Sequence, residues 1–249
     1  MNVRLRLGGN LKISGLPTEL RNELIEALSF PNPKWLENQR MGRWNGGVPK
    51  ELRYYDKVGR DGLWVPRGYM RRLLITLRRE GLDYSLDDER RSLNEVELPF
   101  IGALRDFQRT AVAKMARRDF GTLCAPTGSG KTVMALFLIH QRRQPSLIVV
   151  HTKELAFQWI DRIHSYMGLD KETVGLIGAG RKQVGDSISV ALVQSLYKCA
   201  EEVAPRIGHL VVDECHRAPS RTFTEAVTAF DCRYMLGLSA TPWRRDKLS

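Results

Sequence analysis

Residues 120–139 have the sequence Phe120-Gly-Thr-Leu-Cys-Ala-Pro-Thr-Gly-Ser-Gly-Lys-Thr-Val-Met-Ala-Leu-Phe-Leu-Ile139. Residues 120–125 predict a short buried strand, and residues 133–139 predict an apolar helix. Glycines in the connection let backbone N–H groups close around phosphate oxygens, while a lysine can reach the outer phosphates and a hydroxyl can bind Mg²⁺. The amino end of the helix adds positive potential at the same point. The stretch therefore predicts a strand, a phosphate-binding loop and a helix in that order.

The loop departs from the strict phosphate-binding pattern at one position. That pattern begins with glycine, whereas this chain has Ala125. A glycine-rich turn with an incidental lysine is the alternative, but the strand before the loop and the helix after it favour a phosphate site. The residues expected to contact phosphate are Thr127, Gly128, Ser129, Gly130, Lys131 and Thr132.

A pair of carboxylates follows a second buried strand. His209-Leu-Val-Val212 has no polar alternation, which is typical of a strand covered on both faces, and Asp213-Glu-Cys-His216 comes directly after it. Open α/β sheets bind their ligands at such strand ends. Together with Thr132, Asp213 is expected to hold Mg²⁺, and Glu214 is expected to orient an attacking water. The candidate catalytic residues of a nucleoside triphosphatase are therefore Lys131, Asp213 and Glu214.

Composition and charge indicate where the chain works and what it binds. Its 249 residues carry a formal net charge of +11, which favours a polyanionic partner, most simply nucleic acid. Four cysteines form no Cys-x-x-Cys pair, so neither a zinc site nor a disulfide framework is expected, and Cys215 is expected to pack in the core. The start lacks the apolar core of a signal peptide, and the longest apolar run, 133–139, is too short to span a membrane. We expect an intracellular, cytoplasmic protein without membrane contact, nucleoid-associated if the chain is bacterial.

An uneven distribution of charge predicts two domains. Residues 34–79 hold 12 Lys/Arg and 4 Asp/Glu, whereas residues 80–97 hold 2 and 7. With Pro99 just beyond, this change predicts a boundary near residue 98. Residues 1–98 have the pattern of a small α+β domain of order β-α-β-β-α-β, and in residues 99–249 strands alternate with helices. The second pattern predicts an α/β fold with a parallel sheet.

With the order of these motifs in view, residues 100–249 resemble the first RecA-like lobe of a superfamily 2 DExH-box helicase. Leu104-Arg-Asp-Phe-Gln108 resembles the glutamine element of that family, and the resemblance implies that the Gln108 amide contacts adenine. The alternative is a helix start with a polar face. The resemblance also implies ATP and Mg²⁺ as cofactors, and transmission of the nucleotide state by His216, Ser239 and Thr241.

Two further strings resemble family elements that hold a nucleic-acid backbone. The first, Val149-Val-His-Thr-Lys-Glu-Leu-Ala-Phe-Gln-Trp159, places Thr152 and Lys153 between a strand and a helix, where a hydroxyl and helix N–H groups can bind phosphate. Thr152 as an ordinary N-cap is the alternative. The second string, around Gln194, occupies a similar place later in the chain.

Within the superfamily, the Gly237-Leu-Ser-Ala-Thr-Pro242 string resembles the XPB-like group and related phage recombination helicases, which implies double-stranded or branched DNA as substrate. That group often carries Arg-Glu-Asp soon afterwards, whereas this chain has Arg244-Arg-Asp246. The sequence stops at Ser249, so the second lobe and its arginine finger are not part of it. Such fingers contribute about 10³–10⁵ in rate, and we expect weak ATP binding and slow hydrolysis by this chain alone.

The first 98 residues interleave aromatic and basic side chains, a mixture that suits nucleic acid. Aromatic rings can stack on exposed bases, and cations can contact phosphates. The residues that define the mixture include Trp35, Trp44, Tyr54, Tyr55, Trp64 and Tyr69, and the candidate phosphate contacts are Arg40, Arg43 and Arg53. The alternative is that the aromatic rings form the core of a small domain and the cations lie on an ordinary solvated face.

These observations favour the ATP-binding half of a DNA helicase or translocase that remodels duplex or branched DNA in repair or recombination. Three other functions stay open. They are the motor of a restriction system, a DNA-binding protein for which the nucleotide acts only as a switch, and an RNA helicase.

Overall fold

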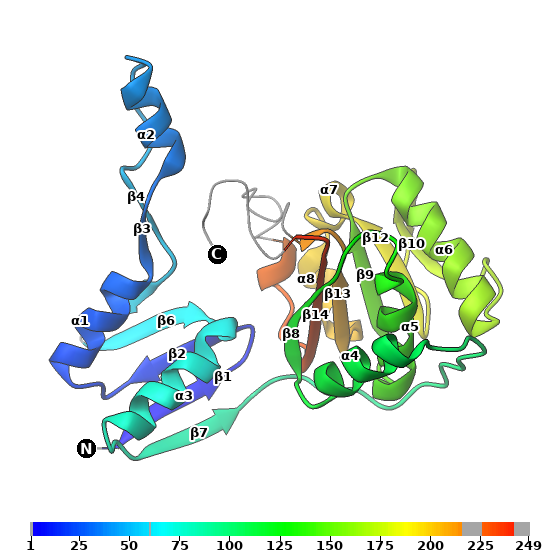
Figure 1. Cartoon of the computed structure of the whole chain (residues 1–249), viewed down its shortest axis with the longest axis horizontal. Helices are drawn as coiled ribbons and strands as arrows, with labels where there is room; N and C mark the ends of the chain where they lie inside the picture. Colours follow the sequence, from blue (N-terminus) through cyan, green and yellow to red (C-terminus); the bar gives the residue numbers. More distant parts are fainter. Residues whose placement is uncertain (1, 60, 216–225, 242–249) are drawn as a thin grey trace. The chain divides into compact units, whose positions relative to one another are not determined.

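The computed structural model describes residues 2–59, 61–215 and 226–241. Within them the chain forms two compact units, of which the first ends at Glu89 and the second begins at Arg90 (Figure 1). His216, Arg244–Asp246 and most of the helix expected at 220–230 lie outside the described residues. None of the helices in the described part combines the length and the apolar character that crossing a membrane requires.

The first unit is built on a five-stranded sheet of order β5-β6-β2-β1-β7. Its strands are β1 (Val3–Leu7), β2 (Asn10–Ser14), β5 (Asp56–Val58), β6 (Gly62–Pro66) and β7 (Tyr84–Asp88). The pair β1–β7 is parallel and the other pairs are antiparallel. Alternate residues of β1 are buried, so one face of the sheet is covered. The helices α1 (Thr18–Ala27) and α3 (Met70–Arg79) bury Leu20, Leu24, Leu73 and Leu77 in this unit.

An arm, residues 29–53, extends from this unit. It consists of β3 (Ser29–Pro31), α2 (Pro33–Arg40), a loop and β4 (Glu51–Arg53), and β3 pairs with β4 in antiparallel register. Figure 1 shows α2 at the far end of this ribbon, away from the five-stranded sheet. No residue of α2 is buried. The arm therefore contributes little to a core.

Four elements of the first unit are absent from the sequence-based order. Those elements are β2, β3, α2 and β5. Two of them have local signals: Gly8 and Gly9 form the tight turn before β2, and Asn32 caps α2 by accepting from the N–H of Lys34, with Pro33 at its first position. The strand β3 has only three residues, too short for a periodicity to show.

The second unit has a seven-stranded sheet of order β11-β10-β12-β9-β13-β14-β8, parallel except for β11. Its strands are β8 (Phe120–Cys124), β9 (Ser146–Val150), β10 (Gly175–Gly178), β11 (Arg181–Gln183), β12 (Ile188–Leu192), β13 (His209–Val212) and β14 (Tyr234–Ser239). Its helices are α4 (Asp106–Ala116), α5 (Lys131–Arg142), α6 (Lys153–Met167), α7 (Val193–Leu196) and α8 (Ala200–Val203). The predicted α/β fold with a parallel sheet is confirmed.

Both faces of this sheet are covered. Every residue of β9 is buried, and its residues alternate between two apolar clusters. Ile148 and Val150 pack in the cluster that includes α4, α5 and α6, and Leu147 and Val149 pack in the cluster that includes α7 and α8. At the edge, β10 and β11 form an antiparallel hairpin. Gly178, Ala179 and Gly180 all adopt positive φ there, at 128°, 52° and 82°.

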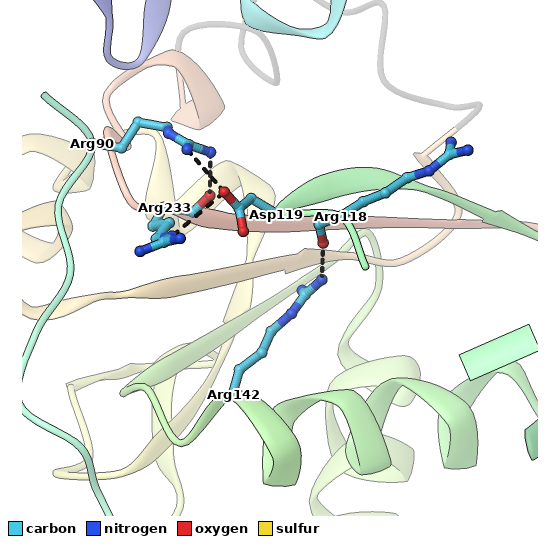
Figure 2. A network of polar contacts seen from close by, with 5 residues as sticks. All are labelled: Arg90, Arg118, Asp119, Arg142 and Arg233. Atoms are coloured by element: carbon cyan, nitrogen blue, oxygen red, sulfur yellow. Dashed lines mark hydrogen bonds and ion pairs between the residues drawn. The ribbon is translucent and has the colours of Figure 1, made fainter. Parts of the chain in front are cut away.

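The segment that follows Glu89 is bonded to the second unit. Arg90 forms an ion pair with Asp119 at 2.8 Å, and Arg233 approaches the same carboxylate at 3.4 Å (Figure 2). The backbone of Leu93 exchanges two hydrogen bonds with the side-chain amide of Gln144, at 2.7 and 2.9 Å. These contacts begin before residue 98, where the sequence analysis placed the boundary. Charge composition could not locate them because they depend on pairing with distant residues.

A buried histidine lies at the amino end of β13. His209 is fully buried, and its Nε2 contacts the Arg142 guanidinium at 2.7 Å, so it accepts that hydrogen bond as a neutral imidazole. Arg142 also donates to the carbonyl of Arg118 (Figure 2), and burial lowers its pKa to about 10. Burial, together with the charge of Arg142, lowers the pKa of His209 well below its ordinary value.

This depressed pKa predicts a loss of stability in mild acid. As the pH falls below about 6.5, the unfolded chain gains a proton on His209 that the folded chain excludes. The free energy of unfolding should therefore fall between pH 7 and pH 5, with a contribution of up to about 1.4 kcal/mol per pH unit. His209→Gln should reduce that slope, as measured by urea denaturation at several pH values. The exposed His164 on α6 supplies the control, and an equal change of slope in His164→Gln would contradict the assignment.

Candidate functional site

Five parallel strands bring the candidate residues of the second unit to one edge of its sheet. Each residue or loop follows the carboxyl end of a strand: 125–132 after β8, Thr152 after β9, Gln194 after β12, Asp213 after β13 and Ser239 at the end of β14. The strand register keeps these strand ends level with one another. Ser239 lies opposite Cys124, and the Asp213 N–H donates to the carbonyl of Val149. This edge is where open parallel sheets bind ligands.

The phosphate-binding loop has a geometry that only glycine adopts without strain. Gly128 and Gly130 have φ of 81° and 82°, and Gly130 is the N-cap of α5. Lys131 Nζ donates to the carbonyls of Ala125 at 2.8 Å and Pro126 at 3.2 Å, which holds the ammonium beside the loop. Within the described part of the chain, Ser129 Oγ is buried and has no hydrogen-bond partner. A cation, a helix amino end and a buried unpaired hydroxyl together fit a polyphosphate.

Gln108 is attached to this loop. Its Nε2 donates to the Ser129 carbonyl at 2.9 Å, and its Oε1 accepts from the Arg105 N–H at 2.9 Å. A Cβ on Gly130 would lie 2.3 Å from Nε2, so the Gln108 amide passes close to the glycine backbone. An amide has two donor hydrogens and two acceptor lone pairs, and each group of Gln108 uses one. The side chain supports the loop and keeps capacity for a further partner.

Asp213 is held by two hydrogen bonds. The indole Nε1 of Trp159 donates to Oδ2 at 2.8 Å, and the N–H of Glu214 donates to Oδ1 at 2.9 Å. Trp159 is buried on α6. Glu214 adopts a positive φ of 49°, a strained conformation for a residue with a side chain. The carboxylate thus has a fixed orientation, which the sequence analysis did not foresee.

The loop and the two carboxylates line a single cleft of about 540 Å³, a size typical of ligand sites. Its lining includes the expected Gln108, Thr127, Gly128, Gly130, Lys131, Thr132, Asp213 and Glu214. It also includes Arg105 before α4, and Arg162 and Tyr166 on α6, which sequence reasoning missed. A signal for the last two exists, because positions 159, 162 and 166 share one helical face.

The end of β14 connects directly to the phosphate loop. The Ala125 N–H donates to the Ser239 carbonyl at 3.1 Å, and Ser239 Oγ donates to the Thr241 carbonyl at 2.6 Å. His216 lies outside the described residues. Cys215 packs against Gly237 in the second apolar cluster, as expected, and burial raises the pKa of its thiol to about 11.

The candidate nucleic-acid contacts fall in both units. Thr152 caps α6 by accepting from the Leu155 N–H at 3.3 Å, and Lys153 and Gln194 are exposed nearby on the same sheet edge. Arg40, Arg43 and Arg53 are exposed on the arm of the first unit. The structure therefore brings together the second-unit candidates but divides the whole set between two compact bodies.

Comparisons with known proteins agree with this geometry. A family model described as "Type III restriction enzyme, res subunit" matches residues 101–244. The chain is 34% identical over 173 residues to the DNA 3'-5' translocase XPB2 of Sulfurisphaera tokodaii, and this match covers 68% of the chain and 38% of that relative. It is 32% identical over 227 residues to a putative ATP-dependent RNA helicase of Acanthamoeba polyphaga mimivirus, across 86% of the chain and 38% of that relative.

A solved structure gives the same fold. The UvsW helicase of Bacteriophage T4 superposes with a TM-score of 0.69 at 19% identity, over 97% of this chain and 93% of that one. The chain spans about two fifths of the length of the curated relatives it matches. The family model, in contrast, covers more than half of the chain. The chain therefore belongs to the family described as the res subunit of type III restriction enzymes, and its second unit is the N-terminal RecA-like lobe of a superfamily 2 helicase.

Proposed function

We propose that this chain is the ATP-binding part of a DNA translocase or helicase that remodels duplex or branched DNA in repair or recombination. The observation that carries the proposal is the single cleft that Lys131, Asp213 and Glu214 share at the carboxyl edge of the sheet. A lysine on a glycine-rich loop opposite paired carboxylates is the arrangement that phosphoryl transfer to water requires.

In this proposal the residues of the cleft have separate roles in binding and hydrolysis. The loop N–H groups and Lys131 would bind the β- and γ-phosphates, and Thr132 and Asp213 would hold Mg²⁺, which would supply positive charge beside the phosphates. Glu214 orients the attacking water and accepts its proton. Gln108 uses its remaining donor and acceptor for the adenine edge while it supports the loop at Ser129.

Trp159 is a positioning residue in the same proposal. Its indole N–H donates a hydrogen bond to Asp213 Oδ2 and thereby fixes the orientation of the carboxylate. Outer hydrogen bonds of this kind orient metal ligands and contribute to metal affinity. Asp213 would then hold the ion without a change of side-chain rotamer.

Coupling to nucleic acid is proposed to pass through β14. The hydrogen bond between Ala125 and Ser239 connects the phosphate loop to the Ser239–Thr241 turn. A displacement of the loop would therefore displace the turn as well. Thr152, Lys153 and Gln194 follow neighbouring strands at the same edge and are proposed to contact the nucleic-acid backbone.

DNA is the proposed substrate because the archaeal relative is named a DNA translocase and the chain carries a net charge of +11. The name of the mimivirus relative favours RNA as a second candidate. The family description favours the motor of a restriction system as a third. Binding to matched DNA and RNA duplexes separates the first two candidates.

Two substitutions test the ATP site. Lys131→Ala should weaken binding of a fluorescent ATP analogue with Mg²⁺ at least about tenfold, because a charge-assisted contact is lost. Glu214→Gln should retain binding and lower the steady-state hydrolysis rate by about 10²-fold or more. Lys114→Ala, an exposed lysine on α4, is the control. Slow turnover by the unaltered chain stays a prediction, and rapid DNA-stimulated hydrolysis would contradict it.

Trp159→Phe tests the support of Asp213. The change keeps an aromatic ring but removes the indole donor, so affinity for ATP with Mg²⁺ should fall about tenfold. Affinity for ATP in EDTA should change much less. Ile160→Val, a neighbour on α6 without a polar contact, controls for a loss of packing. Equal losses with and without Mg²⁺ would show that Trp159 serves only to fill space.

Arg40→Ala/Arg43→Ala tests the arm as a DNA-binding element. Each lost phosphate contact should reduce the slope of log affinity against log salt by about one, and binding to DNA should weaken for all sequences alike. Arg4→Ala/Arg78→Ala removes two exposed arginines of the same unit outside the arm. The same reduction in this second variant would mean that net charge, rather than the arm, determines the slope.

A further inference from the structure

Trp44 lies on the loop of the arm and is 87% exposed. Among the described residues no other large apolar side chain exceeds 67% exposure. The interpretation that the tryptophans of this unit form its core is therefore wrong for Trp44. Leaving an indole in water forgoes one of the largest apolar burials available to a side chain. The position calls for a partner that covers the ring.

The backbone that carries this exposed ring is held by hydrogen bonds on both sides. On one side of Trp44, the Arg43 N–H donates to the Asn38 carbonyl at 2.8 Å, and on the other, Asn45 Nδ2 donates to the Trp35 carbonyl at 3.2 Å. A Cβ on Gly46 would lie 1.9 Å from the Trp44 ring, so the ring rests against the Gly46 backbone. Both neighbours of Trp44 are thus anchored to α2, so little backbone has to be ordered when the ring binds a partner.

The surroundings of Trp44 are cationic rather than apolar. The arm contains Lys34, Arg40, Arg43, Lys50 and Arg53 against Glu37 and Glu51. Of the arm's described cations, only Arg53 has an ion pair, with Glu51 at 3.9 Å, and that contact is exposed. An apolar partner surface would remove water from these charges and offer them no opposite charge, whereas phosphates complement them.

We propose that Trp44 stacks on an unpaired base at a DNA branch point, while the arginines of the arm contact the adjacent phosphates. The inference rests on the proposed function and specifies its substrate. In uninterrupted duplex each base face is covered by its neighbours, so an indole finds a free face only where strands separate or end. Removal of an aromatic ring that stacks on a base lowers affinity roughly 5- to 150-fold. Trp44 thereby distinguishes branched DNA from continuous duplex.

The test compares the full chain with Trp44→Ala and Trp44→Phe on a three-way fork and on a continuous duplex of equal length. Trp44→Ala should lower affinity for the fork roughly 5- to 150-fold and leave duplex affinity within twofold, and Trp44→Phe should retain most of the preference. A 2-aminopurine at the branch point should be quenched by the unaltered chain and by Trp44→Phe, but not by Trp44→Ala. Trp64→Ala, a 44%-exposed tryptophan of β6 outside the arm, should behave like the unaltered chain.

The possible failures are distinguishable. If the unaltered chain binds neither DNA, the proposed function fails and this inference with it. If the chain binds DNA but Trp44→Ala keeps the fork preference, or loses fork and duplex affinity equally, only the stacking inference is overturned. A concentration-dependent dimer in sedimentation that Trp44→Ala abolishes, with fork binding unchanged, would assign the ring to a second copy of the chain instead.

Discussion

The parallel pairing of β8, β14, β13 and β9 is the constraint on which the rest of the second unit depends. Parallel strands all end at the same edge, so residues separated by about a hundred positions in sequence meet there without any direct local signal. The backbone bonds from Ala125 to Ser239 and from Asp213 to Val149 keep these ends in register. Trp159 adds a side-chain bond from α6 to the same edge, and this bond gives Asp213 one orientation.

The opposite edge of the sheet uses buried polar groups for a different purpose. There, the buried His209 contacts Arg142, and Asp119 binds Arg90 and Arg233. No residue expected in phosphate or metal binding lies at this edge. Its bonds attach the chain that enters the unit to the starts of β8 and β14. One edge thus stabilises the fold, while the other keeps polar groups available at its cleft.

The sequence was sufficient to locate the strand-loop-helix at 120–139 and the carboxylates after β13, because apolar runs bounded by glycine or acidic residues are local features. It could not show that Trp159 bonds to Asp213, because that contact joins two elements 54 positions apart. Arg162 and Tyr166 share a helical face with Trp159, but the same spacing fits ordinary core packing. The arm was missed for another reason: α2 buries no residue, so it has no apolar periodicity to detect.

The join between the units falls between two consecutive residues. The Glu89 N–H donates to the Leu7 carbonyl in the first unit, and the next residue, Arg90, pairs with Asp119 in the second. The change from one unit to the other thus falls within one peptide unit, whereas charge composition is averaged over many residues. The partners on either side of this change, Leu7 and Asp119, lie far apart in sequence, so no local pattern could have located it.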